Sequence, residues 1–140
     1  GTIFPIPGVE SFLKKLHAAD IRMAIASSST VEMIFTELDV LGFISYFDNI
    51  ISGNLLPSKP APDVFQVAAA SIRAQPSQCV VIEDSVAGIT AAKNAGMRTI
   101  AVTTTNPADK FGQADRVTED FRKFDLDALK SLFVTDFSNL

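Results

Sequence analysis

The amino-acid sequence predicts an α/β fold with a mostly parallel sheet. Segments with helical periodicity alternate with short apolar runs along most of the chain, and this alternation is typical of parallel strands joined by helices. The apolar run at residues 79–82 (Cys-Val-Val-Ile) is continuous, which indicates a strand buried on both faces. The 140 residues, 47% of them hydrophobic, are enough for one globular core without disulfides or a structural metal.

The first predicted unit is a helix followed by a strand. The helix follows Pro7 and Gly8 and has an apolar stripe at the spacing i, i+3, i+4 and i+7. That stripe consists of Val9, Phe12, Leu13 and Leu16. The strand at residues 21–26 leads into a polar loop at residues 27–29.

The second unit has the same order. Ser29 and Glu32 have the spacing of a capping box, which predicts the start of a helix. Its expected apolar face consists of Val31, Ile34, Phe35 and Leu38. Gly42 ends this helix, and residues 47–52 form the second predicted strand.

A loop interrupts the alternation, which then resumes. Gly53 and three prolines break regular structure over about ten residues. The next helices are expected at residues 63–72 and 86–95. The next strands are expected at residues 79–82 and 99–102, with a marginal fifth at 116–117. Residues 103–115 are predicted to be a loop with at most a short helix.

Composition argues against several kinds of partner. A net charge of −4 without blocks of like charge disfavours nucleic acids and anionic membranes. No apolar run approaches the roughly 18 residues of a membrane-spanning helix. Cys79 is the only cysteine, and with no signal segment we expect a cytoplasmic protein. His17 and Cys79 are expected to be an exposed residue and a small core residue, respectively, without a chemical role.

Chemistry-bearing residues follow three of the predicted strands. In a parallel sheet, ligands collect outside the carboxyl ends of the strands. Residues 27–30 (Ser-Ser-Ser-Thr) follow the first strand, Lys59 lies in the loop after the second, and Glu83 and Asp84 follow the third. Hydroxyls, a lysine and two carboxylates at one edge would suit a phosphate held beside a divalent cation.

Each of these features also has a purely structural interpretation. Serine and threonine commonly cap helices, and a loop lysine is commonly solvated. Acidic residues are also favourable at a helix N-terminus, although two adjacent carboxylates repel each other unless a cation is bound. The combination and order of the three features are more specific than any one of them.

This combination resembles the haloacid dehalogenase superfamily of phosphohydrolases and phosphomutases. Residues 21–27 are similar to its second motif, residues 58–63 (Ser-Lys-Pro-Ala-Pro-Asp) to its third, and residues 81–88 to its fourth. Residues 7–9 (Pro-Gly-Val) and 94–97 (Asn-Ala-Gly-Met) fit the branch that contains β-phosphoglucomutase and small sugar phosphatases. The resemblance implies a Rossmann-like three-layer core.

The resemblance also implies roles for particular residues. Ser27 and Lys59 would be catalytic, with Ser27 binding the transferring phosphoryl group and Lys59 neutralising its charge. Ser28 and Ser29 would add phosphate or substrate contacts. Glu83 and Asp84 would bind Mg²⁺.

The family's first motif, a strand ending in Asp-x-Asp, has no counterpart before Ser27. The pair Asp125 and Asp127 follows no apolar strand, so we interpret Asp125 as a helix cap. We therefore expect residues 1–140 to be the carboxyl-terminal part of a longer protein, which would supply the nucleophilic Asp. This part would lack the first, central strand and the helical cap. Without its missing N-terminal segment, the chain would be inactive and prone to self-association.

The expected function is a Mg²⁺-dependent phosphatase acting on a small phosphorylated metabolite, with sugar phosphates as the expected class. A phosphomutase is the alternative, but Thr30 and Val31 occupy the places of the Lys-Asn pair with which β-phosphoglucomutase grips a second phosphate. A non-catalytic remnant that binds an anion or a partner protein is another. A flavodoxin-like nucleotide-binding domain is disfavoured because the chain has no Gly-rich phosphate loop.

Overall fold

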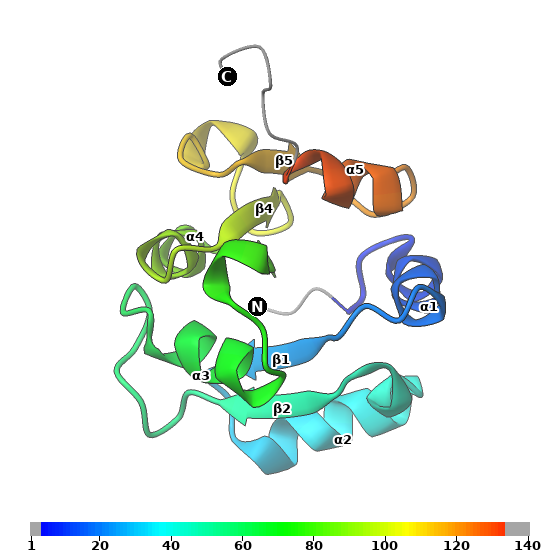
Figure 1. The fold of residues 1–140 in the computed structure, drawn as a ribbon, viewed down its shortest axis with the longest axis vertical. Helices are drawn as coiled ribbons and strands as arrows, with labels where there is room; N and C mark the ends of the chain where they lie inside the picture. The colour runs from blue at the N-terminus through cyan, green and yellow to red at the C-terminus, as the bar shows by residue number, and fades with distance from the viewer. Residues whose placement is uncertain (1–3, 134–140) are drawn as a thin grey trace.

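Helices and strands alternate along residues 4–133, the part of the chain that the computed structural model describes (Figure 1). The α-helices are α1 (Val9–Ala18), α2 (Val31–Leu41), α3 (Asp63–Ser71), α4 (Val86–Asn94) and α5 (Leu126–Ser131). The strands are β1 (Ala24–Ser27), β2 (Asn49–Ser52), β3 (Val80–Glu83), β4 (Arg98–Val102) and β5 (Arg116–Thr118). Short 3-10 helices lie at Ile44–Tyr46 (η1), Pro76–Gln78 (η2) and Ala108–Lys110 (η3). The predicted α/β class is confirmed.

The strands form two parallel sheets rather than one continuous sheet. β1 pairs with β2, and β4 pairs with β3 on one side and β5 on the other. Within residues 4–133, β1 and β3 each have a single strand partner, and they do not pair with each other. The two groups of strands are separate in Figure 1. The break lies between the strand that ends in Ser27 and the strand that ends in Glu83, where the central strand was expected.

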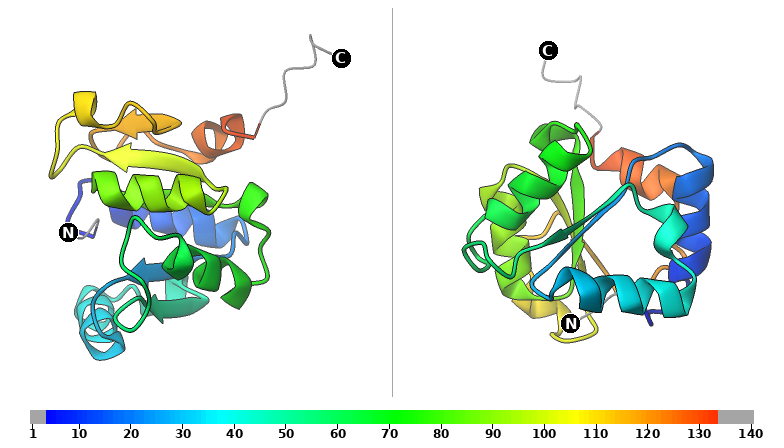
Figure 2. Two further views of the ribbon diagram at one scale, coloured as in Figure 1. Left: turned by 90° about the vertical axis from the view of Figure 1, so that its left-hand side faces the viewer. Right: turned by 90° about the horizontal axis from the view of Figure 1, so that it is seen from below.

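Helices cover both faces of the strands and give three layers. Figure 2 (right) shows α3 and α4 on one side of the strands and α1, α2 and α5 on the other. On the α1 side, Ile25 of β1 and Ile82 of β3 contribute to one apolar core. On the α3 side, Ala26 of β1 and Val81 of β3 contribute to another. The two sheets therefore share the same helical layers, although their backbones are not hydrogen-bonded to each other.

Most strands begin later than the sequence predicts. β1 starts at Ala24 because Asp20 turns the chain with a positive φ of 57°. The amide of Met23 also bonds to the side chain of Asp48 at 2.8 Å. β3 starts at Val80, after Cys79 has bonded back to η2. As a result, Ser27 and Glu83 are the last residues of β1 and β3 rather than the first residues of loops.

The predicted capping box of α2 is wrong. Thr30 caps this helix, and its Oγ1 accepts a hydrogen bond from the amide of Met33 at 3.3 Å. Ser29 belongs to the preceding loop, where its amide donates to Ser27 Oγ at 3.2 Å. Of residues 27–30, Thr30 therefore caps α2, whereas Ser27 and Ser29 bond to each other in the turn between β1 and α2.

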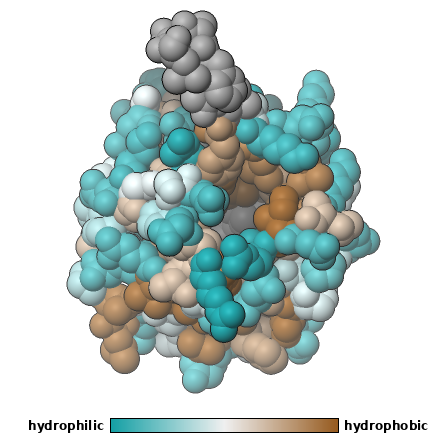
Figure 3. All heavy atoms as spheres, viewed as in Figure 1, coloured by the Kyte–Doolittle hydropathy of each residue, from teal (hydrophilic) through white to brown (hydrophobic). Residues whose placement is uncertain are grey.

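The predicted apolar face of α2 is half right. Ile34 and Leu38 are buried, but Val31 and Phe35 are 48% and 49% exposed. α2 packs mainly against β2 and η1, so a narrow apolar stripe suffices for its packing. Met33 and Val40 are exposed as well, and Figure 3 shows apolar side chains along the lower edge of the molecule, where α2 lies.

The predicted cap of the last helix is confirmed. Asp125 precedes α5, and its Oδ1 accepts a hydrogen bond from the amide of Ala128 at 3.0 Å. The segment before it is not a strand, although Phe121 and Phe124 are buried, with Phe121 stacked on Phe12 at 5.1 Å. None of the helices between residues 4 and 133 is long and apolar enough to cross a bilayer.

Candidate active site at the carboxyl edge of the strands

Ser27 ends β1 beside the end of β2. Ser27 is in register with Ser52, so the loops after both strands start at the same edge. The carbonyl of Ser27 accepts a hydrogen bond from the Gly53 amide at 2.6 Å. Ser52 Oγ donates to the carbonyl of Ser29 at 2.5 Å. These bonds between the two loops fix the backbone that carries the serines.

The three serines have different surroundings. Ser27 Oγ already accepts the Ser29 amide, but a hydroxyl that accepts one bond can still donate another. Ser28 is exposed and lines a cavity of about 230 Å³. Ser29 has both its amide and its carbonyl engaged within the loops. Ser28 therefore lines the cavity, whereas the backbone of Ser29 stabilises the turn.

Lys59 lines the same cavity and contacts Glu83, one member of the predicted acidic pair. The cavity is lined by Ser28, Gly53, Pro57, Ser58, Lys59 and Val64. Lys59 Nζ is 2.8 Å from Glu83 Oε2, and the two side chains are only 19% and 12% exposed. The ammonium also lies 4.8 Å from the centre of the Phe65 ring. The lysine is therefore held by a carboxylate and an aromatic face rather than solvated in its loop.

Glu83 is fixed by the first turn of α4. Its Oε1 accepts hydrogen bonds from the Asp84 amide at 3.2 Å and from the Ser85 hydroxyl at 3.2 Å. Ser85 in turn caps α4 by accepting from the Gly88 amide at 3.0 Å. A Cβ on Gly88 would lie 2.2 Å from Glu83 Cδ, so only glycine leaves room for this carboxylate.

Asp84 is the most deeply buried charged residue of the described chain. It is 3% exposed, and its Oδ2 accepts a hydrogen bond from Thr105 Oγ1 at 2.9 Å. Burial raises the pKa of Asp84, the hydrogen bond from Thr105 is the largest effect that opposes burial, and the pKa lies below its ordinary value of 3.8. Asp84 is therefore a carboxylate at neutral pH.

The donor set at this edge fits Mg²⁺ as a partial site. Mg²⁺ in phosphate-handling sites commonly takes one or two protein carboxylates, and phosphate and water complete its shell. Glu83 and Asp84 supply two carboxylates adjacent in sequence, and Glu83 contacts Lys59, which lines the cavity. Residues 4–133 contain no group of three or more acidic, His or Cys side chains placed to hold a metal by themselves. A cation at this site would therefore need further ligands besides Glu83 and Asp84.

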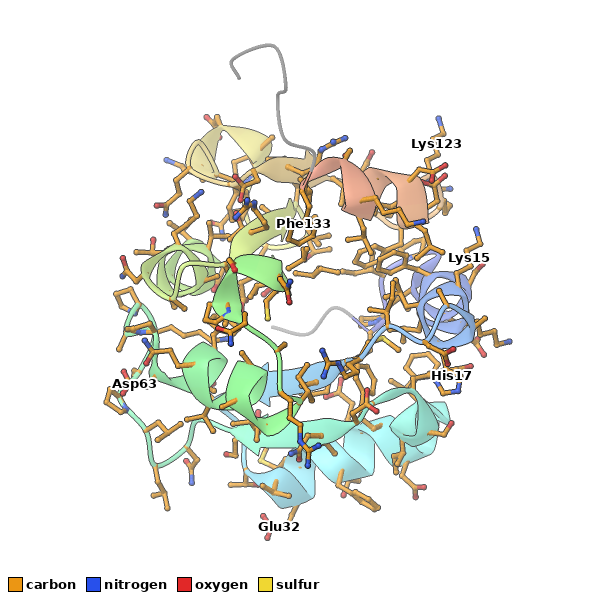
Figure 4. All side chains as sticks on the ribbon, in the orientation of Figure 1. Lys15, His17, Glu32, Asp63, Lys123 and Phe133 are labelled. Carbon is orange, nitrogen blue, oxygen red and sulfur yellow. The ribbon has the colours of Figure 1, made fainter. Side chains whose placement is uncertain are left out.

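His17 and Cys79, which were expected to have no chemical role, lie away from this edge. Figure 4 shows His17 on the opposite side of the molecule from Asp63, the first residue of α3. The His17 ring packs against Tyr46 at 5.7 Å. Cys79 is half-buried beside the α3–α4 core, and its thiol donates to the Gln75 carbonyl at 3.3 Å.

A larger hollow of about 610 Å³ lies on the outer face of α2 and includes none of the predicted site residues.

The sequence analysis includes Gly88 in the fourth motif without giving it a role, and it misses Thr105. The need for glycine at position 88 follows from the position of the Glu83 side chain, which the sequence does not reveal. Thr105 follows β4 at the same edge as Asp84. The run of three threonines directly after a predicted strand was the available signal, because hydroxyls at that edge are within reach of the other strand ends.

Comparison with known proteins assigns the class. Residues 1–102 match the family of haloacid dehalogenase-like hydrolases, and the chain belongs to this family. A probable pseudouridine-5'-phosphatase from Drosophila melanogaster is 38% identical over 106 residues, which cover 69% of this chain and 45% of that protein. Hexitol phosphatase B from Escherichia coli is 36% identical over 98 residues, 69% of this chain and 44% of that protein. The chain thus spans less than half of each of these relatives.

Comparison with solved structures also indicates the branch of the family that contains β-phosphoglucomutase. The crystal structure of β-phosphoglucomutase from Clostridium difficile superposes with a TM-score of 0.82 at 26% identity, covering 91% of this chain and 56% of that one. Because this superposition covers 91% of the chain, the structural similarity extends beyond residue 102.

Proposed function

We propose that the protein to which this chain belongs is a Mg²⁺-dependent phosphatase that acts on a small phosphorylated metabolite, with sugar phosphates as the expected class. The observation that carries this proposal is the half-enclosed cavity in which Lys59, paired with Glu83 at 2.8 Å, lies beside Ser28. A fixed cation next to hydroxyl and amide donors is the arrangement that stabilises a transferring phosphoryl group. The two phosphatase relatives support the reaction type.

Each residue has a distinct task in this proposal. The hydroxyl of Ser27 and the amide of Ser28 hold phosphoryl oxygens, and Lys59 offsets their negative charge. Glu83 and Asp84 would bind Mg²⁺, which supplies further charge neutralisation for the phosphate. Glu83 also keeps Lys59 in place before substrate arrives, because its Oε2 is the ammonium's partner.

The nucleophile in this proposal is an Asp outside residues 1–140. Its carboxylate attacks phosphorus, the bond between phosphorus and the substrate oxygen breaks, and the leaving oxygen takes a proton from a general acid, the second Asp of the Asp-x-Asp motif, which regains a proton from the water that attacks next. Water then attacks the aspartyl-phosphate, releasing inorganic phosphate and regenerating the carboxylate. Glu83 and Asp84 are assigned to Mg²⁺ and Lys59 in this proposal, so neither carboxylate of the acidic pair is left to act as the nucleophile.

We further propose that residues 1–140 form the carboxyl-terminal part of the core domain, completed by a strand between β1 and β3. The support is the single strand partner of each of these strands and the apolar cores that continue across the break. A strand parallel to both would deliver its last residue to the edge where Ser27 and Glu83 end. That position would bring an Asp next to Lys59.

A phosphomutase is the second candidate because of the structural similarity to β-phosphoglucomutase. Thr30 argues against the phosphomutase. A mutase needs a cationic side chain to bind the second phosphate, and Thr30 at that place instead caps α2. Product analysis separates the two reactions. A longer chain that includes the upstream segment is incubated with Mg²⁺ and a panel of sugar phosphates, and free phosphate and isomers are quantified. Phosphate release supports the phosphatase, whereas a predominant isomer overturns it.

A further inference from the structure

A buried carboxylate of the candidate site is held by an exposed loop residue. Asp84 is 3% exposed, and Thr105 Oγ1 donates to its Oδ2 at 2.9 Å. We propose that Thr105 is a positioning residue: its hydroxyl sets the orientation of Asp84 and thereby the affinity of the Glu83–Asp84 pair for a divalent cation. This inference rests on the proposed function, since it concerns the same site.

The sheet register brings the two residues together. β3 and β4 are parallel, and Glu83 is opposite Ala101, so the segments that follow the two strands start side by side. The amide of Thr103 donates to the carbonyl of Thr118 at 3.1 Å, which ties the start of the loop to β5. Two residues later, Thr105 reaches back over the strand ends to Asp84. The contact therefore depends on the pairing of β3 with β4 and on a loop that is hydrogen-bonded to β5.

The other side chain of the acidic pair has a different set of partners. Glu83 is held by Lys59 through Oε2 and by Ser85 and the Asp84 amide through Oε1. The side-chain hydroxyl that reaches Asp84 comes from Thr105. Removing a donor from a buried carboxylate leaves an acceptor that water cannot easily solvate, so the carboxylate is expected to rotate toward another partner. Ligands that rotate lose cation affinity, and outer partners typically account for a 10- to 100-fold difference.

Thr105 lies outside the residues that match the family, 1–102. The family match ends at residue 102, and the acidic pair lies inside it. The role inferred for Thr105 is thus read from the contact in this chain. The neighbouring Thr104 provides a matched control, since it is the same residue type, exposed, in the same loop.

The test compares Mg²⁺ and Mn²⁺ affinity by isothermal titration calorimetry among four variants of a chain extended upstream to include the proposed Asp, since residues 4–133 alone hold only a partial cation site. Thr105→Val is expected to weaken binding by about tenfold or more, because it removes the hydroxyl and keeps the shape. Thr105→Ser, which restores the hydroxyl, and Thr104→Val are expected to stay within about twofold of the unsubstituted chain. Asp84→Asn is the reference for loss of the ligand itself.

The outcomes separate this inference from the proposed function. If Asp84→Asn binds the cations as tightly as the unsubstituted chain, the cation site is elsewhere and the proposed function fails. If Asp84→Asn weakens binding and Thr105→Val does not, the inference about Thr105 is overturned and the site stands. A crystal structure of Thr105→Val gives a readout that needs no cation: a reoriented Asp84 carboxylate supports the inference, and an unchanged one overturns it.

Discussion

Lys59 and Glu83, which are 24 residues apart in the sequence, form an ion pair of 2.8 Å at the carboxyl edge of the strands. The pair joins the loop after β2 to the end of β3 and therefore links the two separate sheets. Because both side chains are largely shielded from water, the pair is a structural feature as well as the centre of the candidate site.

Loss of one partner of this pair should destabilise the fold. Glu83→Gln leaves the Lys59 ammonium without its carboxylate, and we expect the free energy of unfolding to fall by about 2 kcal/mol. Urea denaturation followed by circular dichroism measures this change. In a double-mutant cycle with Lys59→Met, the two effects should be less than additive; strict additivity would mean that the pair contributes nothing.

Gly88→Ala should disturb Glu83 directly. The new Cβ would lie 2.2 Å from Glu83 Cδ, so the carboxylate must leave its place between Lys59 and Ser85. We expect a loss of about 1–3 kcal/mol in the free energy of unfolding. Gly112→Ala is the matched control, because a Cβ there meets nothing within 4 Å. Its effect should stay within about 0.5 kcal/mol, and equal losses for the two variants would refute the steric argument.

Asp115 should make stability depend on acid pH. Burial raises its pKa, but hydrogen bonds from the amide and hydroxyl of Thr99 and the charge of Lys93 outweigh burial, so the pKa lies below the ordinary 3.8. A lowered carboxyl pKa gives stability that is complete above pH 3.8 and is lost as the pH falls through the folded-state value.

The test of this pH dependence is urea unfolding at several pH values between about 6 and 2.5, a range that extends to both sides of the ordinary carboxyl pKa. The unsubstituted chain should lose stability at the acid end of the range more steeply than Asp115→Asn. Asp109→Asn, at an exposed position in η3, is the control. Parallel curves for Asp115→Asn and the unsubstituted chain would contradict the assignment.

Residues 1–140 on their own should self-associate. β1 and β3 each lack a second strand partner within the described chain, and Met33 and Val40 expose apolar surface on α2 at 62% and 81%. Both features favour contacts between copies. Sedimentation velocity should show a mass that rises with concentration, and Met33→Lys with Val40→Lys should reduce it more than Thr104→Lys. A monomer at every concentration would contradict this expectation.

The sequence predicts the architecture well because its signals are local. The helical stripe of α1 at Val9, Phe12, Leu13 and Leu16 is buried as predicted, and the apolar runs mark each strand to within a few residues. Errors occur where long-range contacts decide the outcome. Ser29 does not cap α2 because its amide bonds to Ser27, and Phe35 is exposed because α2 packs at the margin of the sheet.

The candidate site could be predicted in composition but not in detail. Three strand ends were expected to bring serines, Lys59 and two carboxylates to one edge, and the structure places Ser28 and Lys59 in one cavity with Glu83 bonded to Lys59. The direct ion pair, the steric need for Gly88 and the contact of Thr105 with Asp84 depend on distances between segments far apart in the sequence. No periodicity or spacing encodes such distances.

The most direct test of the central claim is the rate of phosphate release from sugar phosphates by a chain extended upstream to include the proposed Asp. Lys59→Met should lower kcat by about 100-fold or more, since it removes the fixed charge beside the phosphoryl group. Lys14→Met replaces an exposed lysine of α1 and should leave the rate unchanged. Activity retained in Lys59→Met, or lost equally in both variants, would contradict the assignment of this edge as the phosphatase site.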